Sequence, residues 1–156
     1  MANSTSANLK LTVQATGENS GTWGQITNTN LLILEQAIGG FTTFNITNAA
    51  RSLTFTNGAL SNGKNEVIKL TGTLASNLTV SIPNSLEKTY LVEDACNHAG
   101  FTLTFKTASG TGVLLCEGNN YTLYSDGTNV VKLHEQRNWR AVSAAETVQA
   151  GAKLLV

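Results

Sequence analysis

Apolar and polar residues alternate along most of this chain, which is the period of half-buried β-strands. The alternation first appears at residues 9–14 and then runs, with interruptions, from residue 41 to residue 133. Thr, Ser, Asn and Lys fill most positions between the apolar ones. The apolar members of the successive strands are Phe44/Ile46, Leu53/Phe55, Ile68/Leu70/Leu74, Leu78/Val80/Ile82, Tyr90/Val92, Phe101/Leu103/Phe105, Val113/Leu115, Tyr121/Leu123 and Val131/Leu133.

Turn-forming pairs such as Asn57-Gly58, Asn62-Gly63 and Asp126-Gly127 separate these runs. Asp126-Gly127 stands directly between two alternating runs and predicts a hairpin. Eight or nine short strands at about ten-residue spacing indicate two antiparallel sheets packed face to face. The fold predicted for residues 41–133 is therefore mainly β, an antiparallel β-sandwich, preceded by an N-terminal arm, a strand and one α-helix.

The predicted helix occupies residues 20–40, where the apolar period changes to that of an amphipathic helix. Ser20 or Thr22 is placed to cap its start, and Gly39-Gly40 to end it in the left-handed conformation. Its only charged residue is Glu35. The apolar stripe is wide and includes Trp23, Ile26, Asn30, Leu34, Ala37 and Ile38. Such a helix is expected to be buried against a sheet or against another subunit.

These patterns divide the chain into three parts. Residues 1–40 form an arm, strand and helix for attachment and oligomerisation, residues 41–133 form the sandwich, and residues 134–156 form a linker. An apolar pattern that starts in this last part is still running at Val156, which predicts either a terminal strand or the start of a further β segment. The candidate interface or docking residues are Trp23, Ile26, Leu34, Ile38, Arg137, Trp139 and Arg140.

Composition excludes several classes of protein. The chain has 156 residues, and its ten Lys and Arg balance ten Asp and Glu. A nucleic-acid binder needs clustered cations, and a membrane-surface helix needs a basic face, so neither partner is expected. No apolar run reaches the length of a membrane span, and the first eight residues lack the order of a signal peptide.

One polar cluster invites a metal-site hypothesis. Asp94, Cys96 and His98 would point to the same side of an extended strand. A zinc site needs a further ligand or an open water position, and only Cys116 and His134 remain to complete one. We therefore expect no metal. Two buried, free thiols are the expected state of the cysteines.

Catalytic patterns are equally weak. Cys96 could act with His134 and Asp126, but no strained turn surrounds the nucleophile. Two of the carboxylates of Glu93, Glu117 and Asp126 could meet in space as a pair for glycoside hydrolysis, but nothing in the sequence supports this. We expect no catalytic residue and no cofactor, and hence no enzyme.

Three segments carry a resemblance to a known family. Residues 14–40, which include GTWGQITNTN, resemble a segment near the start of tail-fibre and related virion proteins of marine bacteriophages. Residues 82–92, 101–107 and 126–131 resemble the β-domain that comes after it in those proteins, and residues 145–156 resemble the opening of a small fibre repeat. Cys96-Asn97-His98 and Cys116 depart from that pattern, since small or polar residues are expected there.

The resemblance implies the proximal part of a phage tail fibre or spike, which attaches to the tail and supports host adhesion. It also implies a homotrimer, located in the virion tail after synthesis in the host cytoplasm, with other tail proteins of the adaptor or nozzle type as partners. Two alternatives remain open. One is a capsid decoration protein bound to the major capsid protein, and the other is a carbohydrate-binding or depolymerising module.

Overall fold

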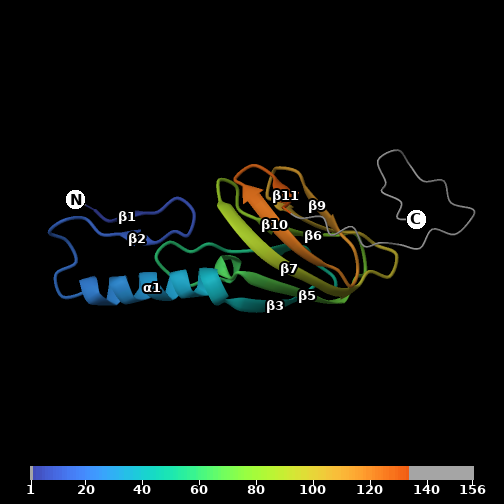
Figure 1. Ribbon diagram of the computed structural model, residues 1–156, viewed down its shortest axis with the longest axis horizontal. Helices are drawn as coiled ribbons and strands as arrows, with labels where there is room; N and C mark the ends of the chain where they lie inside the picture. The colour runs from blue at the N-terminus through green and yellow to red at the C-terminus, as the bar shows by residue number, and fades with distance from the viewer. Residues whose placement is uncertain (1, 134–156) are drawn as a thin grey trace, which may run out of the picture.

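The computed structural model describes residues 2–133 and is mainly β, as the alternating pattern predicts. Two sheets enclose one hydrophobic core, to which strands of both contribute. A hairpin and a helix extend from one end of this two-sheet body (Figure 1). Within the described residues no helix is long and apolar enough to cross a membrane.

One sheet has five strands and the other has four. The five-stranded sheet has the order β11 (Val130–Lys132), β10 (Asn120–Asp126), β7 (Glu87–Asn97), β5 (Val67–Thr73), β3 (Phe41–Asn45). The four-stranded sheet has the order β4 (Arg51–Ser52), β6 (Leu78–Ile82), β8 (Leu103–Thr107), β9 (Gly112–Leu115). A short 3-10 turn, η1 (Asn62–Lys64), precedes β5.

The two sheets are mixed, and this corrects the prediction of antiparallel sheets. From β3 to β8 the chain passes from one sheet to the other at every strand, so that β3, β5 and β7 pair in parallel, as do β4, β6 and β8. Phe41 aligns with Val67, and Val67 with Leu91, so equivalent positions recur roughly every 25 residues. The chain therefore winds as a coil, and each turn of the coil adds one strand to both sheets.

Antiparallel strands complete the other end of the coil. β9 pairs with β8, β10 pairs with β7, and β11 folds back on β10. The Asp126-Gly127 hairpin is thus confirmed: the Asp126 carboxylate accepts hydrogen bonds from the Thr128 and Asn129 backbone N–H groups, and Gly127 has a φ of 88°. The Val130 N–H donates to the Thr111 carbonyl at 3.1 Å, which links the two sheets at this edge.

The core consists of rows of side chains from equivalent positions on successive turns of the coil. Phe105 on β8 lies beside Val80 in register, is fully buried and meets the Tyr90 ring at 5.6 Å between centroids. The Tyr90 hydroxyl donates to the Gly63 carbonyl at 3.2 Å, so this large buried side chain has its polar atom satisfied. Leu103, Leu70 and Leu123 are also fully buried.

Residues 2–40 form a hairpin and the helix α1 (Trp23–Gly39). The expected free arm is part of the hairpin, because β1 (Ser4–Thr5) pairs antiparallel with β2 (Thr12–Val13). The Asn30 side-chain amide of α1 accepts from the Thr12 N–H at 2.9 Å and donates to the Thr12 carbonyl at 2.8 Å. The helix thus offers β2 the hydrogen bonds that a neighbouring strand would give.

The helix ends at Gly39, as the Gly39-Gly40 pair predicts. The reason differs from the expected one: no glycine of the pair ends it in the left-handed conformation, and neighbouring atoms instead come too close to Gly40 for a side chain there. Gly40 has φ −71° and ψ 138°, and its N–H donates to the Gln36 carbonyl. A Cβ at Gly40 would lie 2.3 Å from that carbonyl oxygen and 2.6 Å from Oδ1 of Asn65. Glycine is needed here for space, because helix and sheet meet at this residue.

Candidate functional site

The helix α1 carries two stripes with different surroundings. The inner stripe is Ile26, Asn30, Ile33 and Ala37; Ile33 is fully buried and the others are half-buried. The outer stripe is Thr27, Leu31, Leu34 and Ile38, each one residue after an inner one and therefore rotated from it by about 100°. The inner stripe packs toward the hairpin and the two-sheet body. In the outer stripe Leu31, Leu34 and Ile38 are exposed, whereas Thr27 is half-buried and its hydroxyl accepts a hydrogen bond from Nε2 of Gln14 at 3.1 Å.

The exposure of the outer stripe is large for apolar side chains. Ile38 is 78% exposed, Leu31 is 58% exposed, and Trp23, one turn before Thr27, is 65% exposed. Single exposed apolar residues are normal on protein surfaces, but a row of them on one helix face marks a contact site. Glu35 is the only charged residue of α1, and the other polar residues of this helix are uncharged Thr, Asn and Gln.

A second apolar row crosses the outer face of the five-stranded sheet. Strand register places Phe41, Val67, Leu91, Thr122 and Leu133 side by side, one from each strand or its end, and we call these five residues the sheet row. Phe41 and Leu133 are each more than half exposed, and Leu91 is 41% exposed. The neighbouring row on this face is polar, with Lys69 and Glu93 paired at 2.7 Å.

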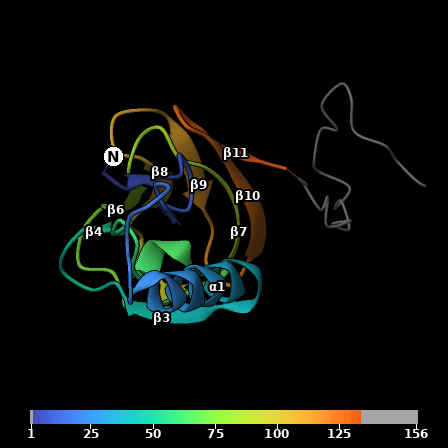
Figure 2. The ribbon, with the colours of Figure 1, turned by 90° about the vertical axis from the view of Figure 1, so that its left-hand side faces the viewer.

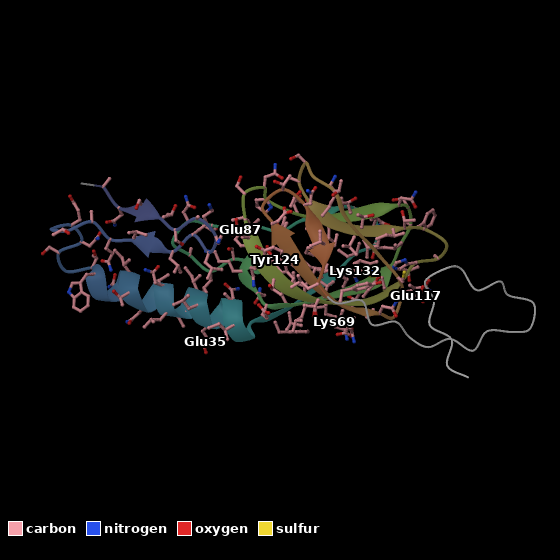
Figure 3. The ribbon with its side chains drawn as sticks, turned by 45° about the horizontal axis from the view of Figure 1, so that its top comes forward. Glu35, Lys69, Glu87, Glu117, Tyr124 and Lys132 are labelled. Carbon is pink, nitrogen blue, oxygen red and sulfur yellow. The ribbon has the colours of Figure 1, made fainter. Side chains whose placement is uncertain are left out.

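Phe41 joins the two surfaces. It comes three residues after Ile38, begins β3 and starts the sheet row. An open hollow of about 420 Å³ lies beside Phe41, and α1 lines it with Leu32 and Glu35 rather than with the outer stripe. In Figure 3, Glu35 on α1 and Lys69 on β5 project to the same side of the molecule, away from the hairpin. The outer stripe and the sheet row are thus two exposed apolar rows, which follow one another along the chain at Ile38 and Phe41.

The structure separates the interface residues proposed from the sequence. Trp23, Leu34 and Ile38 lie on the exposed side of α1, whereas Ile26 belongs to the inner stripe and is half-buried. Arg137, Trp139 and Arg140 lie outside the described residues. Leu31 and Phe41 were not among the interface residues expected from the sequence. Their signal was the spacing from Thr27 to Phe41, which repeats at four, three, four and three residues.

The polar cluster at the end of β7 has a structural arrangement. Asp94 is fully buried, its Oδ2 lies 2.8 Å from Nε2 of His98, and its Oδ1 accepts from the Cys96 N–H at 3.2 Å. The His98 N–H donates to Oε2 of Glu117 at 2.8 Å. Over residues 2–133, no three His, Cys, Asp or Glu side chains are arranged to hold a metal ion. These contacts satisfy buried polar groups on the part of β7 that β10, which begins opposite Glu93, does not cover.

Cys96 in this cluster is poorly suited to nucleophilic chemistry. Burial, together with the neighbouring Asp94 and Glu117 carboxylates, raises the pKa of the thiol to about 12. The thiolate is the reactive form of cysteine, and here its environment disfavours it. Cys116 is exposed, which corrects the expectation that both thiols are buried; both are free.

The two cysteines are expected to differ strongly in reactivity. At about pH 8, far below the pKa of Cys96, Ellman's reagent should modify Cys116 rapidly and Cys96 only after denaturant is added. The Cys116→Ser variant is the matched control and should give almost no rapid reaction. Rapid modification of that variant in its folded state would contradict the burial of Cys96.

Comparisons with protein-family models, with curated proteins and with solved structures each found no match for this chain.

Proposed function

We propose that this chain is a non-enzymatic structural protein of a virion, the proximal part of a phage tail fibre or spike that attaches to the tail and supports host adhesion. The observation that carries the proposal is the presence of two exposed apolar rows, the outer stripe of α1 and the sheet row. A largely uncharged surface of this kind suits a contact made at assembly and then kept, since obligate interfaces are apolar.

The division of the molecule supports the same role. The two-sheet body holds the core, and α1 with its hairpin extends from one end of it, as Figure 1 shows. Figure 2 views that end, with α1 and the hairpin in front of the sheets. A projecting element with a bare apolar face serves attachment and subunit contact, while the body provides a rigid base for the shaft of a fibre. In this proposal the chain forms a homotrimer and docks on other tail proteins of the adaptor or nozzle type.

The location of the chain in particles tests this proposal. An antibody raised against residues 41–133, applied to purified virions of the virus that encodes the chain, should label the tail in electron micrographs. Mass spectrometry of the same virions should recover peptides of the chain in a small number of copies per particle. Label over the capsid would favour a decoration protein, and virions without the chain would overturn the structural role.

Oligomer mass tests the second part of the proposal. Light scattering of the purified chain at micromolar concentration should give the mass of three copies, because the exposed apolar surface is stabilised only when another surface covers it. A stable dimer or a persistent monomer would contradict the homotrimer.

A further inference from the structure

Two Asn-Gly pairs lie in the segment that joins β4 to β5, and the structure holds them in different ways. They are Asn57-Gly58 and Asn62-Gly63. Asparagine is a thermally labile residue, and it reacts fastest when glycine follows it, because no side chain hinders the approach of the glycine nitrogen. Each pair is therefore a candidate site of deamidation, the modification that converts the side-chain amide into an acid.

The reaction needs the backbone nitrogen of the glycine to be free. That nitrogen loses its proton and attacks Cγ of the asparagine; a C–N bond forms, the side-chain nitrogen leaves as ammonia, and a succinimide ring results. Water then opens the ring to aspartate or isoaspartate. A hydrogen bond that holds the glycine N–H against another group suppresses the first step, so the rate follows the fraction of chains in which that bond is open.

Asn62-Gly63 is held entirely by the two-sheet body. The Gly63 N–H donates to the Thr54 carbonyl at 3.1 Å. Oδ1 of Asn62 accepts from the Thr54 N–H at 2.7 Å and from the Thr54 hydroxyl at 3.0 Å. Gly63 is buried and precedes the fully buried Lys64. This pair can react only when the body itself opens.

Asn57-Gly58 is held by the hairpin of β1 and β2 instead. The Gly58 N–H donates at 2.7 Å to the carbonyl of Lys10, which lies between these two strands. A Cβ at Gly58 would collide with Oγ1 of Thr12, so the hairpin lies directly against this glycine. Asn57 is exposed to solvent. The group that blocks the attacking nitrogen thus belongs to a separate part of the chain.

The hairpin is held more weakly than the body. None of its described residues belongs to the hydrophobic core, and its contact with β7 is a hydrogen bond from the Glu87 N–H to Oδ1 of Asn8 at 3.1 Å. Open hollows of about 540 Å³ and about 320 Å³ lie where the hairpin faces this end of the body. Segments with few buried apolar contacts open at a lower free energy than the core. The hairpin can therefore leave its place while the body stays folded.

We propose that Asn57 is a deamidation site controlled by the hairpin. While the hairpin is docked, the hydrogen bond from Gly58 to Lys10 suppresses the reaction. When the hairpin is displaced, Asn57 reacts and Asn62 does not. Loss of ammonia makes the step irreversible, so the modified residue marks chains in which the hairpin has left its place. This control does not depend on the proposed virion role.

The modification also acts back on the hairpin. In isoaspartate the backbone runs through the former side chain, which places one more carbon atom between residue 57 and Gly58. The Gly58 N–H is then displaced from the Lys10 carbonyl, and docking of the hairpin is weakened. Trypsin cuts after lysine, so chains with isoaspartate at residue 57 should be cut after Lys10 faster than unmodified chains. Equal rates of cutting would contradict the part of this hydrogen bond in docking.

Two substitutions at Lys10 test the control. Lys10 has a φ of 56°, which glycine adopts without strain and a β-branched residue does not. Lys10→Val should therefore displace the Lys10 carbonyl and raise the rate of Asn57 deamidation at mildly alkaline pH by at least about tenfold. Lys10→Gly is the matched control: it removes the same side chain and charge, and should react at the rate of the unchanged chain. Peptide mass spectrometry measures both asparagines in each sample.

A substitution on α1 repeats the test at a different contact of the hairpin. Asn30→Ala removes the two hydrogen bonds to Thr12 and should also accelerate the reaction of Asn57. Asn28→Ala, at an exposed position of the same helix, is its control and should have no effect. In all four variants Asn62 should stay unmodified, which reports that the body has remained folded.

Three results would overturn the proposal. In the first, Asn57 of the unchanged chain reacts as fast as Asn57 in a free peptide of residues 54–64. In the second, neither Lys10→Val nor Asn30→Ala accelerates the reaction. In the third, the reaction of Asn62 accelerates together with that of Asn57, since this result means that opening of the body, and not release of the hairpin, controls both sites.

Discussion

Replacing Phe105 by alanine is expected to remove most of the stability of the two-sheet body. The side chain is fully buried, lies beside Val80 and Val113 in register, and contacts the ring of Tyr90. Its truncation leaves a cavity between the two sheets, and changes of this kind cost about 3–5 kcal/mol. Typical domains have about 5–15 kcal/mol in all, so the variant should be close to unfolding at 37 °C.

Phe101→Ala is the matched control for this experiment. Phe101 precedes β8 by two residues and is 39% exposed, so its truncation should cost less than about 1 kcal/mol. Denaturant unfolding followed by circular dichroism gives both free energies of unfolding. Equal losses in the two variants would mean that the core does not lie between the two sheets.

The sequence predicts the strands well and their direction poorly. A period of two places Leu70 and Leu123 inward whether the neighbouring strand is parallel or antiparallel. Short turns at Asn77 and Pro83 resemble hairpin turns, but each carries the chain from one sheet to the other. The composition of a short turn does not distinguish a return within a sheet from a crossing between sheets. Asp126-Gly127 met the hairpin expectation because both flanking runs belong to one sheet, and the turn between β8 and β9 joins antiparallel neighbours in the same way.

The helix was located correctly, but its faces were not resolved. A stripe that includes both Ile26 and Leu34 combines positions that differ by about 80° around the helix. The structure assigns Ile26 to the covered side and Leu34 to the bare side. Because both sides are apolar, periodicity alone cannot divide them; the hydrogen bonds between Asn30 and Thr12 do so.

Buried polar residues were the least predictable feature. Lys64 is fully buried and donates from Nζ to the carbonyls of Thr56 and Ala59, at 2.7 and 2.5 Å. Burial lowers the pKa of this amine. In the sequence, a lysine beside an Asn-Gly pair indicates an exposed loop. Its burial is not predictable, because the carbonyls that accept its hydrogen bonds come together only in the folded chain.

Asp94 is the second buried polar residue that the sequence does not predict. Its position in the strand register explains why loss of its partners is expected to destabilise the body. On the two preceding coils the equivalent positions are Leu70 and Phe44, so a carboxyl group stands where apolar side chains precede it. It is tolerated because β10 begins at Asn120, opposite Glu93, and does not reach this part of β7: the Cys96 N–H has no β10 partner there, and Oδ1 of Asp94 accepts its hydrogen bond. His98 provides the partner for the other oxygen.

His98→Ala is therefore expected to destabilise the body by about 3 kcal/mol. This is a large effect for a residue that lies just after the end of β7. Removing one member of a buried pair leaves the other without its partner, and an unpaired buried carboxylate is costly. Asp94→Asn should cost less than about 1 kcal/mol, because the amide still accepts from the Cys96 N–H and can donate to the imidazole.

The double variant decides between this account and simple loss of packing. Once Asp94 is an asparagine, deletion of the imidazole leaves a neutral amide unpaired, which costs less than an unpaired carboxylate. The Asp94→Asn/His98→Ala variant should then be more stable than His98→Ala alone, by at least about 1 kcal/mol in denaturant unfolding. If His98 acts only by filling space, the two changes are additive and the double variant is the less stable one. That order would reject the pairing of Asp94 with His98 as the reason for the sensitivity of this strand end.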